Sequence, residues 1–138
     1  MYIAIEGNIG AGKSTFSHAL ADRMNAELVL EEFQDHPNLK DFYDGKEIDR
    51  YRMEKWFLDK RFDQLVSAQK AGGHLVSDYW FEKSMIFANI NLKEQDKIRF
   101  AKEFYACQNK IRQPDAIVYI DSSSDELKKS IEGRNRTL

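Results

Sequence analysis

The sequence predicts an α/β fold in which a parallel sheet carries helices on both faces. Short apolar, β-branched runs alternate along the chain with amphipathic runs of helical spacing, a pattern typical of strands joined by crossover helices. A glycine-rich turn links the first strand-like run to the first helical run. Acidic residues follow the second and third strand-like runs, at the sheet edge where such folds bind ligands.

Each element has a local signal of its own. The apolar, β-branched runs predict strands at residues 2–5, 27–30, 74–77 and 116–120. Helical spacing predicts helices at 14–24, 47–71, 80–90 and 93–111, a short piece at 39–43, and a last helix at 124–132 behind a serine cap. The breaks between elements coincide with Asp44-Gly45, Gly72-Gly73 and Pro114.

The first fifteen residues hold the most specific motif of the chain. Residues 7–14 fit the phosphate-loop pattern of Gly, four residues, Gly, Lys and Ser, placed between a strand and a helix. In this pattern Lys13 reaches the β and γ phosphates and the Ser14 hydroxyl binds Mg²⁺. The alternative is a glycine-rich turn that binds nothing. The predicted ATP-binding residues are Gly7, Asn8, Ile9, Gly10, Ala11, Gly12, Lys13, Ser14 and Thr15.

Composition narrows the possible classes of protein. A chain of 138 residues suffices for one core and one domain. The net charge of −2 gives no sign of a general nucleic-acid or membrane-surface binder, and no apolar stretch reaches membrane-spanning length. Cys107 is the single cysteine, so no internal disulfide can form, and we expect a cytoplasmic setting.

Four segments together resemble the deoxynucleoside kinase family, in particular the deoxyguanosine kinase type of Gram-positive bacteria. They are Ile5–Gly10, the acidic turn from Glu31 to Tyr43, the helical Phe57–Phe62, and Asp78-Tyr79 with Lys83–Ala88. The resemblance covers essentially the whole chain. It implies transfer of the γ-phosphoryl group of ATP, with Mg²⁺, to the 5′-hydroxyl of a deoxynucleoside. It also implies a three-layer phosphate-loop sandwich with strand order 2-3-1-4, the fifth strand missing.

The resemblance assigns roles to two carboxylates. Glu31 corresponds to the general base that takes the proton of the attacking hydroxyl. The alternative is a solvated loop carboxylate, and the residues alone do not distinguish Glu31 from Glu32. Asp78 corresponds to the acidic residue that holds Mg²⁺ opposite Ser14. The alternative for Asp78 is an N-cap of the following helix.

The sequence departs from the family pattern at a cation beside the transferred phosphate. The commoner family pattern has an arginine directly after the acid at 78, whereas this chain has Tyr79. Lys83, Arg134 and Arg136 are the candidates to replace it. The two arginines resemble the start of the family's lid, where arginine forks clamp the phosphate. The alternative for them is a basic tail.

Glu54 is the most informative residue for substrate specificity. It falls where many family members carry a base-reading glutamine, which both donates and accepts. An ionised glutamate only accepts, so it suits the adjacent N1–H and 2-amino donors of guanine and opposes adenine or cytosine. We therefore expect deoxyguanosine or a related 6-oxopurine. The alternative is an exposed helix glutamate paired with a Lys or Arg.

Four further residues correspond to the substrate site of the family. Arg61 reaches the base from the same helix face and can pair with Glu54; its alternative is a surface ion pair. Phe87 corresponds to the aromatic residue that stacks on the base, and its alternative is core packing. Tyr43 corresponds to the residue that binds the sugar 3′-hydroxyl, and its alternative is an amphipathic residue at the rim. Met53 lines the base pocket, although core packing is its default.

Taken together, these features predict a kinase of nucleotide salvage. Residues 1–138 form its single predicted domain, and the sequence ends within the lid. From that ending we expect an incomplete copy with weak or no activity, below the turnover of about 1–100 per second of kinases. The resemblance implies a homodimer, for which the apolar face of residues 93–111 is available. The alternatives are a kinase for deoxyadenosine, another nucleoside or a nucleoside monophosphate, and a non-catalytic nucleotide-binding subunit.

Overall fold

The computed structural model describes residues 1–7, 12–31 and 49–121. The chain divides into two compact units, which we describe separately. The sheet unit comprises Met1–Leu30, Gly72–Trp80 and Pro114–Leu138, and the helical unit comprises Glu31–Ala71 and Phe81–Gln113. Within the described residues of the two units, no helix is long and apolar enough to cross a membrane.

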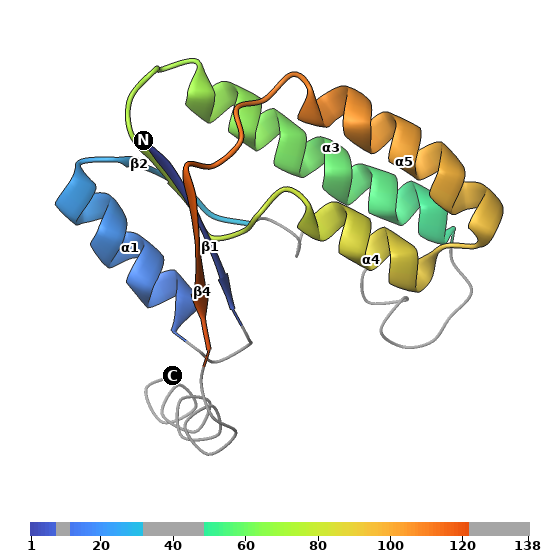
Figure 1. Cartoon of the computed structure of the whole chain (residues 1–138), viewed down its shortest axis with the longest axis horizontal. Helices are drawn as coiled ribbons and strands as arrows, with labels where there is room; N and C mark the ends of the chain where they lie inside the picture. Colours follow the sequence, from blue (N-terminus) through green and yellow to red (C-terminus); the bar gives the residue numbers. More distant parts are fainter. Residues whose placement is uncertain (8–11, 32–48, 122–138) are drawn as a thin grey trace. The chain divides into compact units, whose positions relative to one another are not determined.

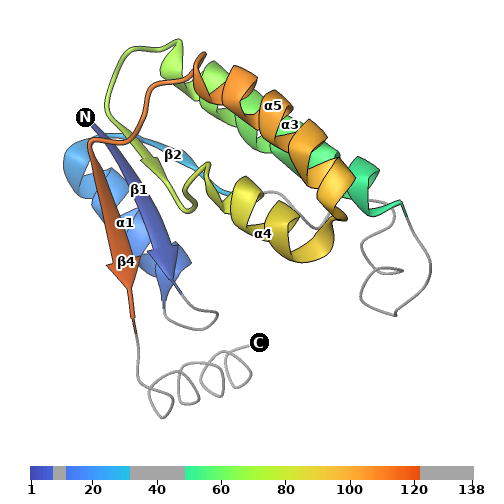
Figure 2. The same ribbon diagram turned by 45° about the vertical axis from the view of Figure 1, so that its right-hand side comes forward.

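The sheet unit is built on four parallel strands in the order β2-β3-β1-β4 (Figures 1 and 2). The strands are β1 (Tyr2–Gly7), β2 (Glu27–Val29), β3 (Leu75–Ser77) and β4 (Ala116–Ile120). Ala4 and Val29 both pair with Ser77, so β3 lies between β1 and β2. The predicted fold class and the predicted strand order are confirmed.

Helix α1 (Lys13–Met24) packs against this sheet (Figure 1). Its Ala21 joins Ile5 and Val76 in a buried apolar cluster, because these side chains all face the space between helix and sheet. Gly7 ends β1 where β4 comes closest, and a Cβ atom there would lie 2.6 Å from the carbonyl oxygen of Ile120. A side chain at position 7 would therefore clash with the backbone of β4.

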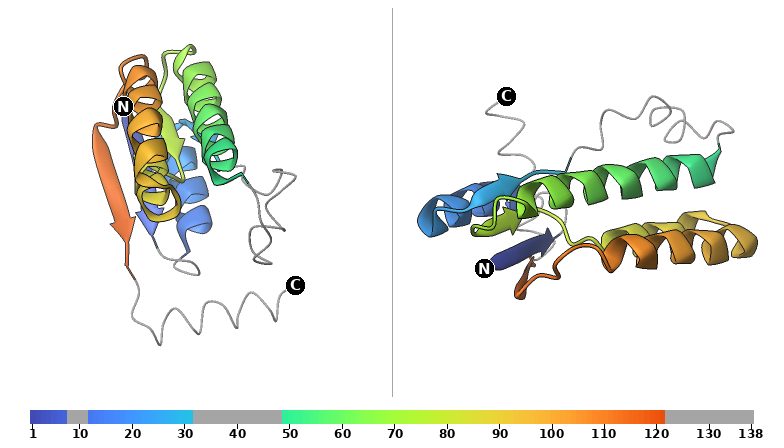
Figure 3. Two further views of the ribbon diagram at one scale, coloured as in Figure 1. Left: turned by 90° about the vertical axis from the view of Figure 1, so that its right-hand side faces the viewer. Right: turned by 90° about the horizontal axis from the view of Figure 1, so that it is seen from above.

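The helical unit contains three helices, α3 (Arg50–Gln69), α4 (Lys83–Asn91) and α5 (Glu94–Gln108), shown from two sides in Figure 3. Both α4 and α5 contact α3. Asp49 begins α3 by accepting a hydrogen bond from the N–H of Arg52 at 3.1 Å. Buried aromatic side chains hold the helices together, and the rings of Phe81 and Phe104 stack with centroids 5.1 Å apart.

Helix boundaries are where the prediction differs most from the structure. The helix predicted at 80–90 begins only at Lys83, because the preceding residues form a tethered turn. The N–H of Trp80 donates to Glu6 Oε1 at 2.7 Å, and Ser77 Oγ donates to the Tyr79 carbonyl at 2.7 Å. The predicted helical pieces at 39–43 and 124–132 lie outside the described residues.

We expect Ser77→Ala to lower the free energy of unfolding by about 1–3 kcal/mol, the cost of leaving buried polar groups without partners. Ser77 is fully buried and donates to the Tyr79 carbonyl, so the Tyr2 hydroxyl 3.0 Å away must donate to Ser77 Oγ. Alanine removes the acceptor of the Tyr2 hydroxyl and the Ser77 O–H that donates to the Tyr79 carbonyl. Urea denaturation measures the change.

Ser67→Ala is the matched control for this substitution. Ser67 is exposed on α3, and we expect its replacement to change the free energy of unfolding by less than about 0.5 kcal/mol. If Ser77→Ala were no more destabilising than this control, the buried hydrogen-bond chain would have no structural role.

Candidate functional site

The phosphate-loop motif stands between β1 and α1, as its chemistry requires. Of its residues, 8–11 lie outside the described part, whereas Gly7 ends the strand and Gly12 precedes the helix with a φ of 81°. That left-handed conformation suits glycine and turns the chain into the first helical turn. Lys13 is half-buried there, and Ser14 and Thr15 are exposed. Their first-turn N–H groups belong to the positive end of the helix, which favours an anion.

Asp78 follows β3 directly, at the carboxyl end of the sheet. Its backbone N–H donates to the Val29 carbonyl at 3.0 Å, which fixes the residue beside the end of β2. The residue is buried, with 9% of its surface exposed. The residue that precedes α4 as its N-cap is Glu82, so the alternative of a helix cap at Asp78 is wrong. Ser14 and Asp78 offer the oxygen ligands that Mg²⁺ prefers.

Glu31 lies in the helical unit with each carboxylate oxygen held by a different cation. Arg61 Nη2 lies 2.9 Å from Oε1, and Lys83 Nζ lies 2.9 Å from Oε2. The Glu31 side chain is 6% exposed and that of Arg61 5%, so this is a buried ion cluster. Arg61 Nη1 also donates to Ser84 Oγ at 3.0 Å, which anchors the guanidinium to α4. The alternative of a solvated Glu31 is therefore wrong.

The two cations set the protonation state of Glu31. Burial by itself raises the pKa of the carboxyl, but the charges and hydrogen bonds of Arg61 and Lys83 outweigh it and leave the pKa below 4.5. Glu31 is thus a carboxylate at neutral pH. An ionised carboxylate only accepts hydrogen bonds, so Glu31 can act as an acceptor and not as a donor.

Glu54 is a second buried carboxylate of the helical unit, and 3% of its surface is exposed. Asn91, the last residue of α4, donates through Nδ2 to Glu54 Oε1 at 2.9 Å. Burial raises the pKa of Glu54 above 4.5 in spite of Asn91 and the positive charge of Arg61. The alternative of an exposed helix glutamate is wrong.

The profile of the deoxynucleoside kinase family matches residues 3–138 of the chain. The chain belongs to the deoxynucleoside kinase family. Its relatives include a deoxyguanosine kinase of Bacillus subtilis, 32% identical over 98% of this chain and 67% of that protein. A deoxyadenosine kinase of Dictyostelium discoideum is also 32% identical, over 98% of this chain and 57% of that protein. The family consists of enzymes that transfer phosphate to a nucleoside hydroxyl.

Solved structures of this family share the fold. A deoxyadenosine kinase from M. mycoides with the products dCMP and dCDP bound superposes with a TM-score of 0.75 at 25% identity, over 99% of this chain and 72% of that one. The dATP-bound form of that enzyme gives 0.73 at 23% identity, over 99% of this chain and 73% of that one. Relatives of both base preferences are thus similar to this deoxynucleoside kinase.

The commoner family pattern has an arginine at position 79, where this chain has a tyrosine. Tyr79 is fully buried and Lys83 pairs with Glu31, so Lys83 supplies a positive charge at this carboxylate. Lys83 was one of three candidates from the sequence, and the other two, Arg134 and Arg136, lie outside the described residues.

The four remaining predicted substrate residues have four different outcomes. Arg61 pairs with Glu31, whereas in the described part of the chain Glu54 accepts its hydrogen bond from Asn91, so the expected Arg61–Glu54 pair is replaced. Phe87 is 38% exposed and lies 5.7 Å from the Lys83 ammonium, so it is no core residue. Met53 is 2% exposed and belongs to the core. Tyr43 lies outside the described residues.

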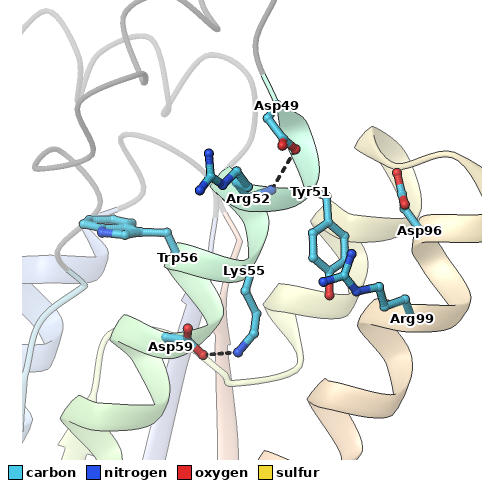
Figure 4. A pocket seen from close by; sticks show the side chains of 8 residues that line it. All are labelled: Asp49, Tyr51, Arg52, Lys55, Trp56, Asp59, Asp96 and Arg99. Carbon is cyan, nitrogen blue, oxygen red and sulfur yellow. Dashed lines mark hydrogen bonds and ion pairs between the residues drawn. The ribbon is translucent and has the colours of Figure 1, made fainter.

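A charged hollow of about 660 Å³ on the helical unit lies apart from these carboxylates (Figure 4). Its lining comes from α3, α5 and Asp49 and excludes Glu31 and Glu54. Two of its cations already have a contact within the hollow: Lys55 pairs with Asp59, and the Arg99 guanidinium lies 4.2 Å from the Tyr51 ring centroid. We assign it no ligand.

We expect Lys83→Met to lower the free energy of unfolding at pH 7 by about 1.5–3 kcal/mol, the range for a hydrogen bond to a charged group. Because the folded-state pKa of Glu31 lies below 4.5, the stabilisation is present above that pH and is lost as the pH falls through the folded-state value. The difference between the two proteins should therefore shrink on acidification. Urea denaturation across pH 3–7 measures it.

Lys97→Met is the control, because Lys97 pairs with Glu94 on the surface, where the Glu94 side chain is 86% exposed. Such a pair is worth at most about 1 kcal/mol. Equal losses in the two variants, or a loss at Lys83 that does not change with pH, would contradict the buried ion cluster.

Proposed function

We propose that this deoxynucleoside kinase transfers the γ-phosphoryl group of ATP to the 5′-hydroxyl of a purine deoxynucleoside, with deoxyguanosine preferred. The observation that carries the proposal is Glu31, a buried carboxylate whose two oxygens are each paired with a different cation, which keeps the group ionised. The chain spans 67% of the length of the Bacillus subtilis relative and 57% of that of the Dictyostelium discoideum relative, and the proposal refers to the activity of the protein that contains it.

ATP would bind through the sheet unit. In this proposal the backbone of residues 7–15 and the Lys13 ammonium bind the phosphates, as the phosphate-loop pattern requires. Ser14 and Asp78 would hold Mg²⁺, which neutralises the charge that develops on the phosphate oxygens. Two protein oxygens suffice, because Mg²⁺ usually keeps several waters.

The acceptor would bind through the helical unit. Glu31 accepts a hydrogen bond from the 5′-hydroxyl and orients its oxygen towards the phosphorus. Because the pKa of Glu31 is lowered, the carboxylate is a weak proton acceptor, which suits a loose transition state in which positioning matters most. Lys83 and Arg61 keep Glu31 ionised and in place. Phe87, beside Lys83 and partly exposed, remains the candidate to stack on the base.

The proposed preference for guanine rests on Glu54. The relatives of the chain include both deoxyguanosine and deoxyadenosine kinases, so the comparisons do not decide which base the substrate carries. A carboxylate offers acceptors alone and matches the two donors of the guanine edge. Burial of Glu54 makes a mismatch costly, because the wrong base leaves polar groups unpaired.

The test is a single-turnover assay with the protein in excess, which detects slow chemistry. ATP labelled on the γ phosphate is mixed with Mg²⁺ and deoxyguanosine, deoxyadenosine or deoxycytidine. We expect the label in deoxyguanosine monophosphate before the other products, and a labelling rate lower by a factor of about 10²–10⁴ in the variant Glu31→Gln. Nucleotide binding without any labelled product would instead favour a non-catalytic nucleotide-binding subunit.

We further infer that the protein forms a homodimer, lies in the cytoplasm and acts in nucleotide salvage. Ile98 and Tyr105 on α5 are 64% and 54% exposed, which supports an association through this helix. Light scattering of the purified protein measures the mass, and a monomer at micromolar concentration would contradict the dimer.

A further inference from the structure

The two oxygens of Glu54 have different surroundings. Oε1 accepts a hydrogen bond from the Asn91 amide at 2.9 Å. Among the residues that the structure describes, Oε2 has no hydrogen-bond donor, although only 3% of Glu54 is exposed. Oε2 is not one of the fully enclosed side-chain atoms without a partner in the described residues, so it keeps enough access to accept from a further donor. The donor that makes the two oxygens differ is Asn91, which has no functional signal in the sequence.

The Asn91 amide restrains Glu54 in two ways. It ties the carboxylate on α3 to the C-terminal end of α4, so the plane of the carboxylate cannot rotate freely. Its N–H donor also requires a lone pair on Oε1, which opposes a proton on that atom. Burial pushes the pKa of Glu54 upwards, and Asn91, together with the charge of Arg61, works against it.

We propose that Asn91 is a specificity-determining residue that acts through Glu54, holding its carboxylate as a fixed, two-oxygen acceptor that suits a 6-oxopurine and rejects a 6-aminopurine. This inference rests on the proposed function, in which Glu54 reads the base. Asn91 is thus a positioning residue, and its own amide makes no contact with the base in this account.

The effect on base choice follows from donor and acceptor chemistry. A neutral carboxyl group has one O–H donor and one carbonyl acceptor, which matches the N1 acceptor and 6-amino donor of adenine. Without the Asn91 donor, the carboxyl group of Glu54 can rotate and take up a proton. The site then no longer discriminates between guanine and adenine. One hydrogen bond to a charged group corresponds to a factor of about 10 or more in an equilibrium constant.

The experiment compares Asn91→Ala with Asn89→Ala in the full chain. Asn89 lies two residues earlier on α4 and is exposed, so it controls for the same change in the same helix. Dissociation constants for deoxyguanosine and deoxyadenosine are measured by calorimetry, which needs no turnover, and kcat/KM is measured beside them. Both substitutions are repeated in a Glu54→Gln background.

We expect Asn91→Ala to reduce the preference for deoxyguanosine over deoxyadenosine about tenfold, while Asn89→Ala leaves it unchanged. In the Glu54→Gln background, Asn91→Ala should change the ratio less than twofold, because the carboxylate it acts on is gone. An unchanged ratio in Asn91→Ala, an equal change in both backgrounds, or a wild type that binds neither nucleoside would overturn the inference. Wild-type binding of deoxyguanosine without phosphorylation would contradict the proposed function alone.

Discussion

Replacement of Glu31 by glutamine is expected to lower kcat by a factor of about 10²–10⁴, the contribution of a positioned general base. The amide keeps the size of the side chain, but its nitrogen must face Arg61 or Lys83 and cannot accept from the 5′-hydroxyl. The KM for nucleoside should change little, because Glu54 remains to bind the base. Single-turnover rates and calorimetric binding measure the two effects separately.

Glu103→Gln provides the matched control for Glu31→Gln. Glu103 also accepts a hydrogen bond within the helical unit, from the Tyr51 hydroxyl at 2.5 Å, but it has no part in the proposed site. Its kcat should stay within about twofold of the wild type, as for a substitution outside the reacting groups. If Glu31→Gln retained ordinary turnover while folding normally, another group would have to orient the attacking hydroxyl.

Replacement of Glu54 by glutamine should reverse the base preference. We expect the ratio of kcat/KM for deoxyguanosine to that for deoxyadenosine to fall by about 10²–10⁴, the range seen when a buried polar site loses its matching partner. Glutamine offers a donor beside an acceptor, which suits adenine and places an N–H against the donors of guanine. Initial rates with the two nucleosides, at saturating ATP, measure the ratio.

The surroundings of Glu54 allow the substitution by glutamine without loss of the contact between α3 and α4. Its Oε1 position can still accept from Asn91 when the other atom of the side chain becomes an amide, so the contact between α3 and α4 is retained. Thermal unfolding should therefore change little. A stable Glu54→Gln protein with the wild-type preference would show that other residues read the base.

Patterns among residues close together in the sequence were sufficient to predict most of the helices and strands. Alternation of apolar strands with amphipathic helices, and the strand–loop–helix context of Lys13, depend on residues that are neighbours in sequence. The strand at Ala116–Ile120 was predicted to the residue. The start of α4 was missed because Glu6, far away in the chain, holds Trp80 in a turn.

The candidate site residues came from the resemblance to the family, but their partners could not be predicted. The resemblance singled out Glu31, Glu54 and Asp78, because each falls at a position that matches the family's pattern. Only the tertiary structure decided that Lys83, 52 positions away, and Arg61, 30 positions away, hold Glu31. It alone brought Asn91 to Glu54 over 37 positions. The physical reason is that burial and pairing of charges arise where helices pack, and this packing is set by the whole chain.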